Sequence, residues 1–218
     1  MPVSNNLSAA FNMPPEKAIE YFKSKGYQVT FDWHDMWHDA HAQAFTVAGV
    51  TSLDVLVDIR KAIETAQNTG KSLESFKQDL KPLLKKKGWL GEKTIKKPDG
   101  STKEIDLSQP WRLKTIYQTN MQTAYMAGRY KGMIDAIETR PYWRYVAVMD
   151  GRTRDEHRKL HGKVLRYDDP FWDNYFPPNG WGCRCRAVSI SKYEAEKKGL
   201  RITDGEEISP EAALTVAP

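Results

Sequence analysis

The sequence predicts an α+β fold, with a helical N-terminal region followed by a small mixed α/β C-terminal module that contains a short antiparallel sheet. Two observations carry this prediction. In the first half of the chain, apolar residues recur at three- and four-residue steps, as on one face of a helix. After residue 140, short runs of aromatic and β-branched residues alternate with turn dipeptides, which is typical of strands. With 218 residues, of which 40% are hydrophobic, the chain is long enough to bury a core.

The N-terminal region begins with a predicted helix that Pro14-Pro15 opens and Gly26 ends. Alternating apolar residues predict a short extended piece at residues 27–31. Helical spacing then returns, and we expect a second helix at residues 33–47.

Two further helices are predicted before the middle of the chain. Thr51 and Asp54 form a capping-box pattern at the start of a helix that continues to Asn68. Ser72 is the expected N-cap of the next helix. Pro82 lies inside that second pattern, where it either kinks the helix or starts a new turn.

A lysine-rich segment follows these helices. Its glycines and prolines, with Asp99-Gly100 as a typical turn, predict a basic loop or β-hairpin at residues 89–110. The net charge of +5 and the pI near 9.0 favour anionic partners. Such lysine runs are usually solvated surface, and the alternative is contact with the phosphates of double-stranded DNA. The candidate nucleic-acid-binding residues are Lys85, Lys86, Lys87, Lys93, Lys96 and Lys97.

The C-terminal module begins with a long predicted helix from Trp111, which Arg140-Pro141 ends. Residues 142–149 are aromatic and β-branched and predict a buried strand. Thr153 with Glu156 matches a second capping box, which predicts a short helix to about Leu160. Two more strands are expected, with an aromatic and proline-rich loop between them, at residues 163–167 and 185–190.

These elements divide the chain into four parts. Residues 1–88 form the helical N-terminal region, residues 89–110 the basic loop or hairpin, residues 111–192 the C-terminal module and residues 193–218 a C-terminal tail. The composition from Ile202 onward predicts an exposed end or a linker.

The composition also argues against several classes of protein. No apolar run is long enough to cross a bilayer and the N-terminus lacks signal-peptide character, so we expect no membrane partner. The two cysteines, Cys183 and Cys185, are too close in sequence to join distant parts of a secreted fold, which predicts the reducing cytosol or a particle assembled there. The glycine patterns of nucleotide-binding proteins and the common hydrolase motifs do not occur, so we infer no small-molecule substrate and do not expect an enzyme.

The densest group of reactive side chains lies within residues 150–186. His157 and His161 are four residues apart, so a helix places them on one face, and Cys183 and Cys185 can fold back towards them. Two imidazoles and two thiolates make a sufficient ligand set for tetrahedral zinc, and closing such a site stabilises a small module. The predicted ligands of a structural zinc ion are therefore His157, His161, Cys183 and Cys185.

The same residues support a reading without metal. One residue between the two cysteines is a shorter spacing than zinc ribbons use. In this alternative the cysteines are small buried apolar residues beside Arg184, and His157 is hydrogen-bonded locally to Asp150 or Asp155.

A catalytic reading is the other alternative. A histidine could activate a cysteine nucleophile, because the thiolate is the reactive form. His157 or His161 could also cleave a phosphodiester together with neighbouring arginines, namely Arg152, Arg154, Arg158 or Arg184.

Three segments of the chain carry a family resemblance: residues 112–129, 140–162 and 168–186. They contain the motifs D-G-R-T-R, H-x-x-L-H-G and P-P-N-G-W-x-C-R-C, which are specific in combination. Together with residues 14–26 and 80–89, they make the chain resemble the phage Mu F-like head morphogenesis family over residues 14 to 192, so that residues 111–192 correspond to the Mu F-like module. The motif residues are Asp150, Gly151, Arg152, Thr153, Arg154, His157, Leu160, Gly162, Pro177, Pro178, Cys183, Arg184 and Cys185.

The resemblance implies a minor capsid protein of a Mu-like phage or prophage, which acts in procapsid assembly near the portal. It implies the host cytoplasm during assembly and then the virion, in the head interior or at the portal vertex. Portal protein and other head proteins are the implied partners, and packaged DNA is the implied contact of the lysine-rich segment. The alternative function is a nucleic-acid-cleaving enzyme that uses His157 or His161 with the neighbouring arginines.

At the cluster of histidines and cysteines, the chain departs from the pattern of the family that it resembles. Other members carry T-C-x-x-C and later P-P-x-H-x-x-C-R-C, an arrangement that looks like a metal site. Here Arg154 stands at the first cysteine position, His157 at the second and Gly180 at the later histidine. The resemblance leaves His161 as the candidate replacement ligand.

Overall fold

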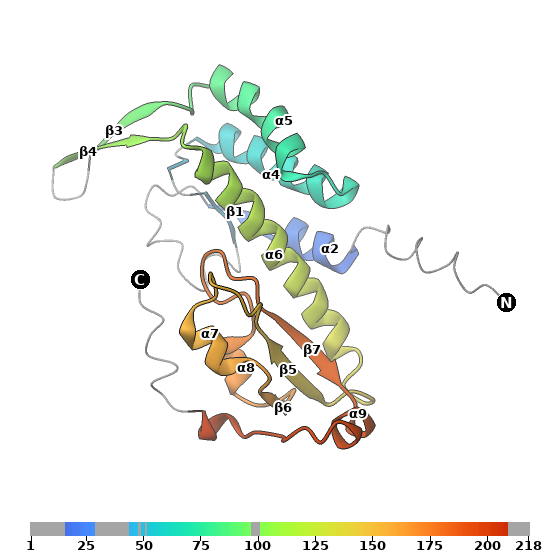
Figure 1. The fold of residues 1–218 in the computed structure, drawn as a ribbon. Coiled ribbons are helices and arrows are strands. Elements are labelled where there is room, and N and C mark those ends of the chain that lie inside the picture. The colour runs from blue at the N-terminus through green and yellow to red at the C-terminus, as the bar shows by residue number, and fades with distance from the viewer. Residues whose placement is uncertain (1–15, 29–43, 48, 51, 97–100, 209–218) are drawn as a thin grey trace. The chain divides into compact units, whose positions relative to one another are not determined.

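The computed structural model describes residues 16–28, 44–47, 49–50, 52–96 and 101–208 (Figure 1). The chain forms two compact units, one within residues 1–121 and the other within residues 122–218. The long helix α6 (Pro110–Ile134) contributes residues to both units. The mixture of helices with small antiparallel sheets confirms the α+β prediction.

Each unit has its own set of elements. The first unit contains α2 (Glu16–Ser24), β1 (Gly26–Tyr27), β2 (Ala44–Phe45), α4 (Leu53–Thr69), α5 (Leu73–Lys86), β3 (Glu92–Lys96), β4 (Thr102–Asp106) and the first part of α6. The second contains the rest of α6, β5 (Tyr142–Val146), α7 (Asp155–Leu160), β6 (Val164–Arg166), α8 (Phe171–Tyr175), β7 (Arg186–Ile190), α9 (Lys192–Lys197) and the 3-10 turn η2 (Gly205–Glu207). None of the helices within the described ranges is long and apolar enough to span a membrane.

Helices α4 and α5 bury the apolar faces that their periodicity predicts. The side chains that are completely withdrawn from solvent on these two helices are Leu56, Ile59, Ile63, Ala66, Leu80 and Leu84. Ser72 is the N-cap of α5, as predicted, because its side chain accepts a hydrogen bond from the Ser75 amide at 3.2 Å. The helix continues through Pro82 to Lys86, so no new element starts at the proline.

The helix predicted at residues 33–47 is wrong at its C-terminal end. Ala44 and Phe45 form β2, which pairs in parallel with Gly26 and Tyr27 of β1. The Phe45 side chain is fully buried, and its ring packs edge-on against Phe22 with the centroids 5.4 Å apart. This non-local packing outweighs the helical spacing of the sequence. The remainder of the predicted helix, residues 33–43, lies outside the described residues.

The basic segment forms the predicted hairpin. Strands β3 and β4 pair antiparallel, with Lys93 opposite Ile105 and Lys96 opposite Thr102. The predicted Asp99-Gly100 turn lies outside the described residues.

The second unit is built on a three-stranded antiparallel sheet in the order β6-β5-β7 (Figure 1). The central strand β5 supplies Trp143 and Tyr145, which are 1% and 0% exposed. They pack in one core with Leu160 of α7 and Trp172 of α8. The predicted strands and the short helix between them are therefore confirmed, and their aromatic side chains form the core that positions α7 and the start of β7.

Both edges of this sheet are covered. Beside β7, the guanidinium of Arg129 donates to the Ala187 carbonyl at 3.2 and 2.9 Å, and Arg140 donates to the Ser189 carbonyl at 3.2 and 2.6 Å. Beside β6, Ile202 pairs in parallel with Val164. The end predicted from residue 202 is exposed at Ile202, as expected, but as far as residue 208 it also packs on the unit through backbone pairing with Val164 and through apolar contact of Ile208 with the core.

Candidate metal centre

Helix α7 positions the first residue of the site. Its N-cap is Arg154, not the predicted Thr153, whose hydroxyl instead donates to the Val148 carbonyl. Asp155 in the first turn of α7 interacts favourably with the positive N-terminal end of the helix. The helix presents His157 to the interior, where it is 5% exposed.

The loop from α8 to β7 positions the other two residues. Gly180 and Gly182 adopt left-handed conformations, with φ of 80° and 69°, which favour glycine. The turn that they make brings Cys183 and Cys185 to one side, where they are 6% and 2% exposed. The side chain of Arg184 between them points outward and is 36% exposed.

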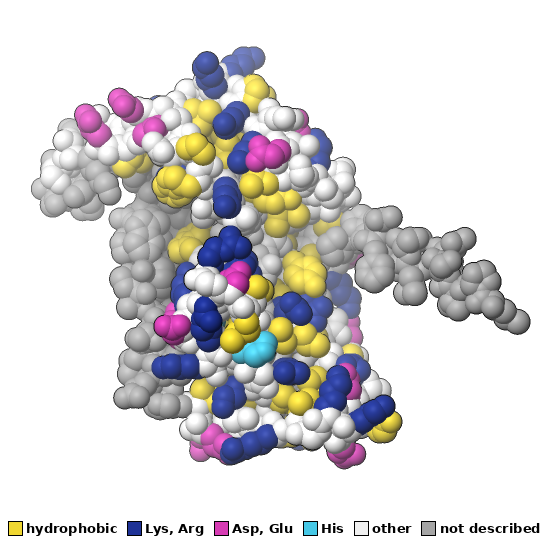
Figure 2. All heavy atoms as spheres, viewed as in Figure 1, with side chains coloured by type: hydrophobic (Ala, Val, Ile, Leu, Met, Phe, Trp, Pro, Cys, Tyr) yellow, Lys and Arg dark blue, Asp and Glu magenta, His cyan; other side chains and the backbone are white. Residues whose placement is uncertain are grey.

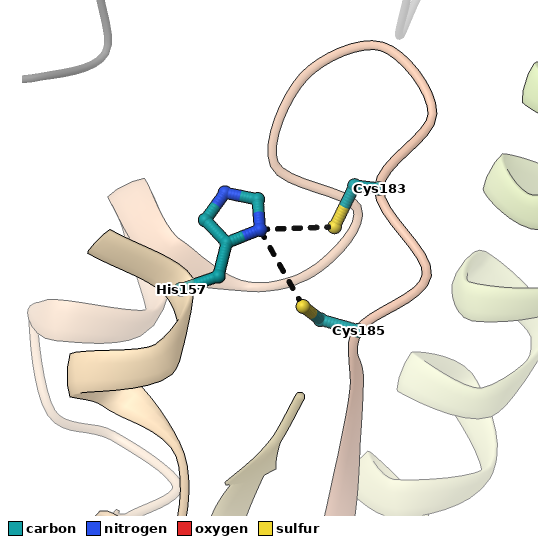
Figure 3. A group of neighbouring side chains, drawn as sticks. All are labelled: His157, Cys183 and Cys185. Atoms are coloured by element: carbon teal, nitrogen blue, oxygen red, sulfur yellow. Dashed lines mark hydrogen bonds between the residues drawn. The ribbon is translucent and has the colours of Figure 1, made fainter. Parts of the chain in front are cut away.

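His157, Cys183 and Cys185 meet as one buried group (Figure 3). The Nδ1 atom of His157 lies 3.8 Å from the Cys183 sulfur and 3.5 Å from the Cys185 sulfur. All three ligand atoms lie within 4.8 Å of one another. The structure thus brings together three of the four predicted zinc ligands.

The two thiols differ in acidity. The Cys183 thiol, as a hydrogen-bond donor to Cys185, lowers the pKa of Cys185 to about 4, and His157 beside it adds to this effect. The same hydrogen bond, together with burial, raises the pKa of Cys183. An imidazole beside a thiolate is a donor set for soft and borderline metal ions.

His161 does not join this group. Helix α7 ends at Leu160, and His161 leaves helical geometry with φ −55° and ψ 127°. Its Nδ1 accepts a hydrogen bond from the Ala147 amide at 3.1 Å, and the residue is exposed. The prediction of a shared face for the two histidines is therefore wrong, because the helix stops one residue too early.

Asp150 organises the turn before α7. Its carboxylate binds the Arg184 guanidinium, and it also accepts a hydrogen bond from the Arg152 amide at 3.0 Å. The Arg184 hydrogen bond holds the pKa of Asp150 well below its usual range, and the Arg152 amide adds to this. Asp155 pairs with Arg158 at 3.6 Å. Asp150 and Asp155, the hydrogen-bond partners predicted for His157 in the absence of a metal, are thus both paired with arginines.

Residues 176–185, between α8 and β7, form a loop that we call the cysteine loop. Arg154 connects this loop to the N-terminus of α7. Its guanidinium donates to the carbonyls of Asn179 and Trp181 at 3.2 and 2.6 Å. A Cβ built on Gly180 would lie 3.6 Å from the same guanidinium. Arg154 and Gly180, the positions to which the family resemblance assigned a cysteine and a histidine, are therefore neighbours here.

A cavity of about 90 Å³ opens beside the buried group. His157 and Cys185 line it together with Arg152, Arg154 and Arg184. Three guanidinium groups and a mainly polar lining suit water or an anion.

The remaining motif residues stabilise the surroundings of the site. Leu160 and Pro177 are buried. Gly162 adopts φ 85° where the chain turns from α7 into β6, and its amide donates to the Tyr145 carbonyl at 2.8 Å. Gly151 and Arg152 are exposed in the turn after β5, and the bond between Pro177 and Pro178 is cis.

Sequence reasoning missed Tyr145 and Asn179. The Asn179 side chain donates to the Tyr145 hydroxyl at 3.2 Å and to the Tyr175 carbonyl at 3.0 Å. Burial is the main cause of the raised pKa of Tyr145, and a hydrogen bond with Cys185 adds to it. The aromatic and β-branched run at residues 142–149 predicted a buried strand that includes Tyr145, but no sequence signal pointed to a polar contact with the loop that carries the cysteines.

The candidate nucleic-acid-binding lysines differ in their exposure and in whether an acidic side chain pairs with them. Lys85, Lys86 and Lys93 are exposed. Lys87 binds Asp54 at 3.0 Å and Asp58 at 2.7 Å, so its charge is already paired. Lys96 lies on β3 without a described side-chain position, and Lys97 lies outside the described residues.

Comparison with known proteins identifies the family. Residues 57–188 match the family described as "Phage Mu protein F like protein". The chain belongs to the phage Mu protein F-like family. This confirms the resemblance that the motifs predicted, and the matched residues include the whole His157, Cys183 and Cys185 group.

Two relatives show how much of a phage Mu protein F-like protein the chain represents. The putative capsid assembly protein F of Escherichia phage Mu is 48% identical over 200 residues, which are 92% of this chain and 46% of that protein. The Mu-like prophage FluMu F protein of Haemophilus influenzae is 44% identical over 190 residues, 86% of this chain and 45% of that protein. The chain spans about half the length of these curated relatives. No solved structure matches it.

Proposed function

We propose that this chain is a head morphogenesis protein of a Mu-like phage or prophage. The observation that carries the proposal is its 48% identity, over 92% of the chain, to a protein named putative capsid assembly protein F. Identity at this level, spread over both units, favours a shared role. We place that role in the host cytoplasm during assembly and then in the virion.

We further propose that the chain acts near the portal and has other head proteins as partners. The support is the family resemblance of the D-G-R-T-R and P-P-N-G-W-x-C-R-C motifs. In the structure these motifs build one packed unit, because Asp150 and Arg154 bind Arg184 and the cysteine loop. A rigid unit of this kind suits a protein whose work is to dock in an assembling particle.

Contact with packaged DNA is the second part of the proposal. Lys85 and Lys86, at the end of α5, and Lys93, on β3, are exposed, and no ion pair is found for them within the described part of the chain. Figure 2 shows Lys and Arg side chains spread over the viewed face among acidic and apolar ones. Such a surface fits contact with phosphates at a few positions more than one continuous nucleic-acid groove.

The test is assembly in cells. Deletion of the gene in a Mu-like prophage should reduce the yield of filled heads, and a tagged full-length protein should appear in purified procapsids and co-purify with portal protein. In the deletion strain, a Trp143→Ala variant, which lacks a large side chain of the core of the second unit, should fail to restore assembly. A Trp111→Ala variant, changed at an exposed position, should restore it. Normal heads in the deletion strain would contradict the proposal. If the protein is incorporated into procapsids but does not co-purify with portal protein, only the proposal that it acts near the portal is rejected.

Nucleic-acid cleavage stays an alternative prediction. The specific observation that favours it is the cavity lined by His157 and three arginines. Purified protein would be incubated with DNA and RNA at several divalent metal concentrations, with His157→Ala and His161→Ala as paired variants. Cleavage that is lost in His157→Ala and kept in His161→Ala would favour the enzyme over the assembly protein.

A further inference from the structure

We propose that His157, Cys183 and Cys185 bind one zinc ion through Nδ1 and the two sulfur atoms, and that a water molecule from the adjacent cavity is the fourth ligand. This inference concerns the stability of the second unit and goes beyond the assembly role. It also changes the predicted ligand set, because His161 is excluded.

The distances fit a single tetrahedral ion. Zinc bonds of about 2.0–2.1 Å to nitrogen and about 2.3 Å to sulfur, at tetrahedral angles, separate the nitrogen from each sulfur by roughly 3.6 Å. The observed separations from His157 Nδ1 are 3.8 Å to Cys183 and 3.5 Å to Cys185. Figure 3 shows both sulfurs facing the same ring nitrogen, so one ion can contact all three atoms.

The chemistry of the donors selects zinc among common cellular ions. Two thiolates and one imidazole are preferred by zinc, whereas calcium and magnesium prefer oxygen ligands. Two thiolates also balance the charge of a divalent ion. A neutral complex costs less to bury than a net charge among side chains that are 2–6% exposed.

The fourth position opens to the cavity. No fourth His, Cys, Asp or Glu donor joins the group within the described part of the chain. His157 and Cys185 both line the cavity of about 90 Å³, which is polar and large enough for ordered water. Arg152 and Arg154 on its wall favour a partly negative or anionic ligand on the metal.

The site would link helix α7 to the two cysteines, which are part of the hydrophobic core of the second unit. His157 comes from α7, and the two cysteines come from the end of the loop that precedes β7. A bound ion links segments 26 residues apart, which stabilises the folded state over the unfolded one.

The first experiment measures metal content and its dependence on the three ligands. Full-length protein, purified without chelators, should contain one zinc per chain. Separate variants His157→Gln, Cys183→Ser and Cys185→Ser should each bind zinc on the order of 100-fold more weakly or worse, since loss of an outer partner alone costs about 10–100-fold. His161→Gln is the matched control, because it removes a histidine four residues away that lies outside the group, and it should keep the full zinc content.

The second experiment uses cobalt as a spectroscopic probe and does not depend on the variants folding well. Wild-type protein loaded with Co²⁺ should show a thiolate-to-cobalt charge-transfer band with the intensity of two sulfur ligands. Azide should then shift the visible cobalt bands, because an exchangeable fourth ligand faces the cavity.

These measurements can overturn each part of the proposal. Wild-type protein with no stoichiometric zinc and no charge-transfer band on cobalt addition would reject the metal site. Equal loss of zinc in His161→Gln would reject the ligand set. Cobalt bands that do not respond to azide would reject the solvent ligand and leave a closed site.

Discussion

Asp150 and Arg184 form a two-pronged ion pair, with 2.7 Å between Nη1 and Oδ2 and 2.6 Å between Nη2 and Oδ1. The pair joins the turn before α7 to the residue between the two cysteines. Planar pairing of this kind restrains direction as well as distance. It therefore explains in physical terms why D-G-R-T-R and C-R-C occur together in one chain.

The first prediction concerns this ion pair and pH. Asp150→Asn should lower the denaturation midpoint at pH 7, because Arg184 stabilises the charged carboxylate only in the folded state. The pKa of Asp150 is lowered from 3.8, so this stability is complete above that pH and is lost as the pH falls through the folded-state pKa. Wild type and variant should converge in acid. Chemical denaturation from pH 7 to pH 2 measures this.

A double-mutant cycle provides the control. Arg184→Gln should cost stability by itself, and adding Asp150→Asn to it should cost little more. Fully additive effects would mean that the two residues act independently.

The second prediction concerns Lys25, which is 4% exposed beside Arg60. Burial, followed by the charge of Arg60, lowers the pKa of Lys25 from 10.5 to about 8. The unfolded state therefore binds more protons between these values, and wild-type stability should rise with pH across that window. Lys25→Met should be more stable than wild type at pH 7 by about 1–3 kcal/mol and should lose this advantage as the pH rises. Lys23→Met, at an exposed position, should show no such pH-dependent gain.

The third prediction concerns the core of the second unit. Trp143 is 1% exposed. Its ring packs against those of Tyr130, Trp172 and Phe176, with ring centroids 5.5–5.7 Å apart. Trp143→Ala should cost about 3–5 kcal/mol, because the surrounding rings cannot fill the space. Trp111→Ala, at a position that is 58% exposed, should cost about 0.5 kcal/mol or less. Similar losses in urea denaturation would show that Trp143 is not central to the core.

The fourth prediction concerns DNA. The triple variant with Lys85→Ala, Lys86→Ala and Lys93→Ala should bind double-stranded DNA more weakly. The slope of log affinity against log salt should become shallower by about 0.9 for each lysine that contacts a phosphate. Fluorescence anisotropy at several salt concentrations measures both quantities.

Lys87→Ala is the matched control for DNA binding. Its charge is paired with Asp54 and Asp58, so the salt slope should not change. An unchanged slope in the triple variant as well would show that none of these lysines contacts a phosphate, so that Lys85 and Lys86 only complement the C-terminal end of α5 and Lys93 only keeps the surface of β3 solvated.

Much of the fold followed from local patterns. The apolar spacing of α4, α5 and α6 and the aromatic runs of β5 predicted these elements, because each buries one face along its own length. Strand β2 was not predictable in this way. It has two residues, and its conformation depends on pairing with β1 and on the contact between Phe45 and Phe22.

The candidate site was predictable in its composition but not in its full geometry. The prediction from the sequence that His157, Cys183 and Cys185 lie close together is confirmed. It placed His161 with them because helical spacing was extended past Leu160, where α7 ends. The hydrogen bonds of Arg154 to the cysteine loop could not be predicted from the sequence either, because they depend on tertiary packing.

The covered edges of the second-unit sheet have a consequence for association between chains. Exposed strand edges recruit further strands from neighbouring molecules and so cause uncontrolled association. Here Arg129 and Arg140 occupy carbonyls of β7, and the segment at Ile202 lies along β6. These contacts leave fewer free backbone groups at the edges of the β6-β5-β7 sheet for pairing with a strand of another chain.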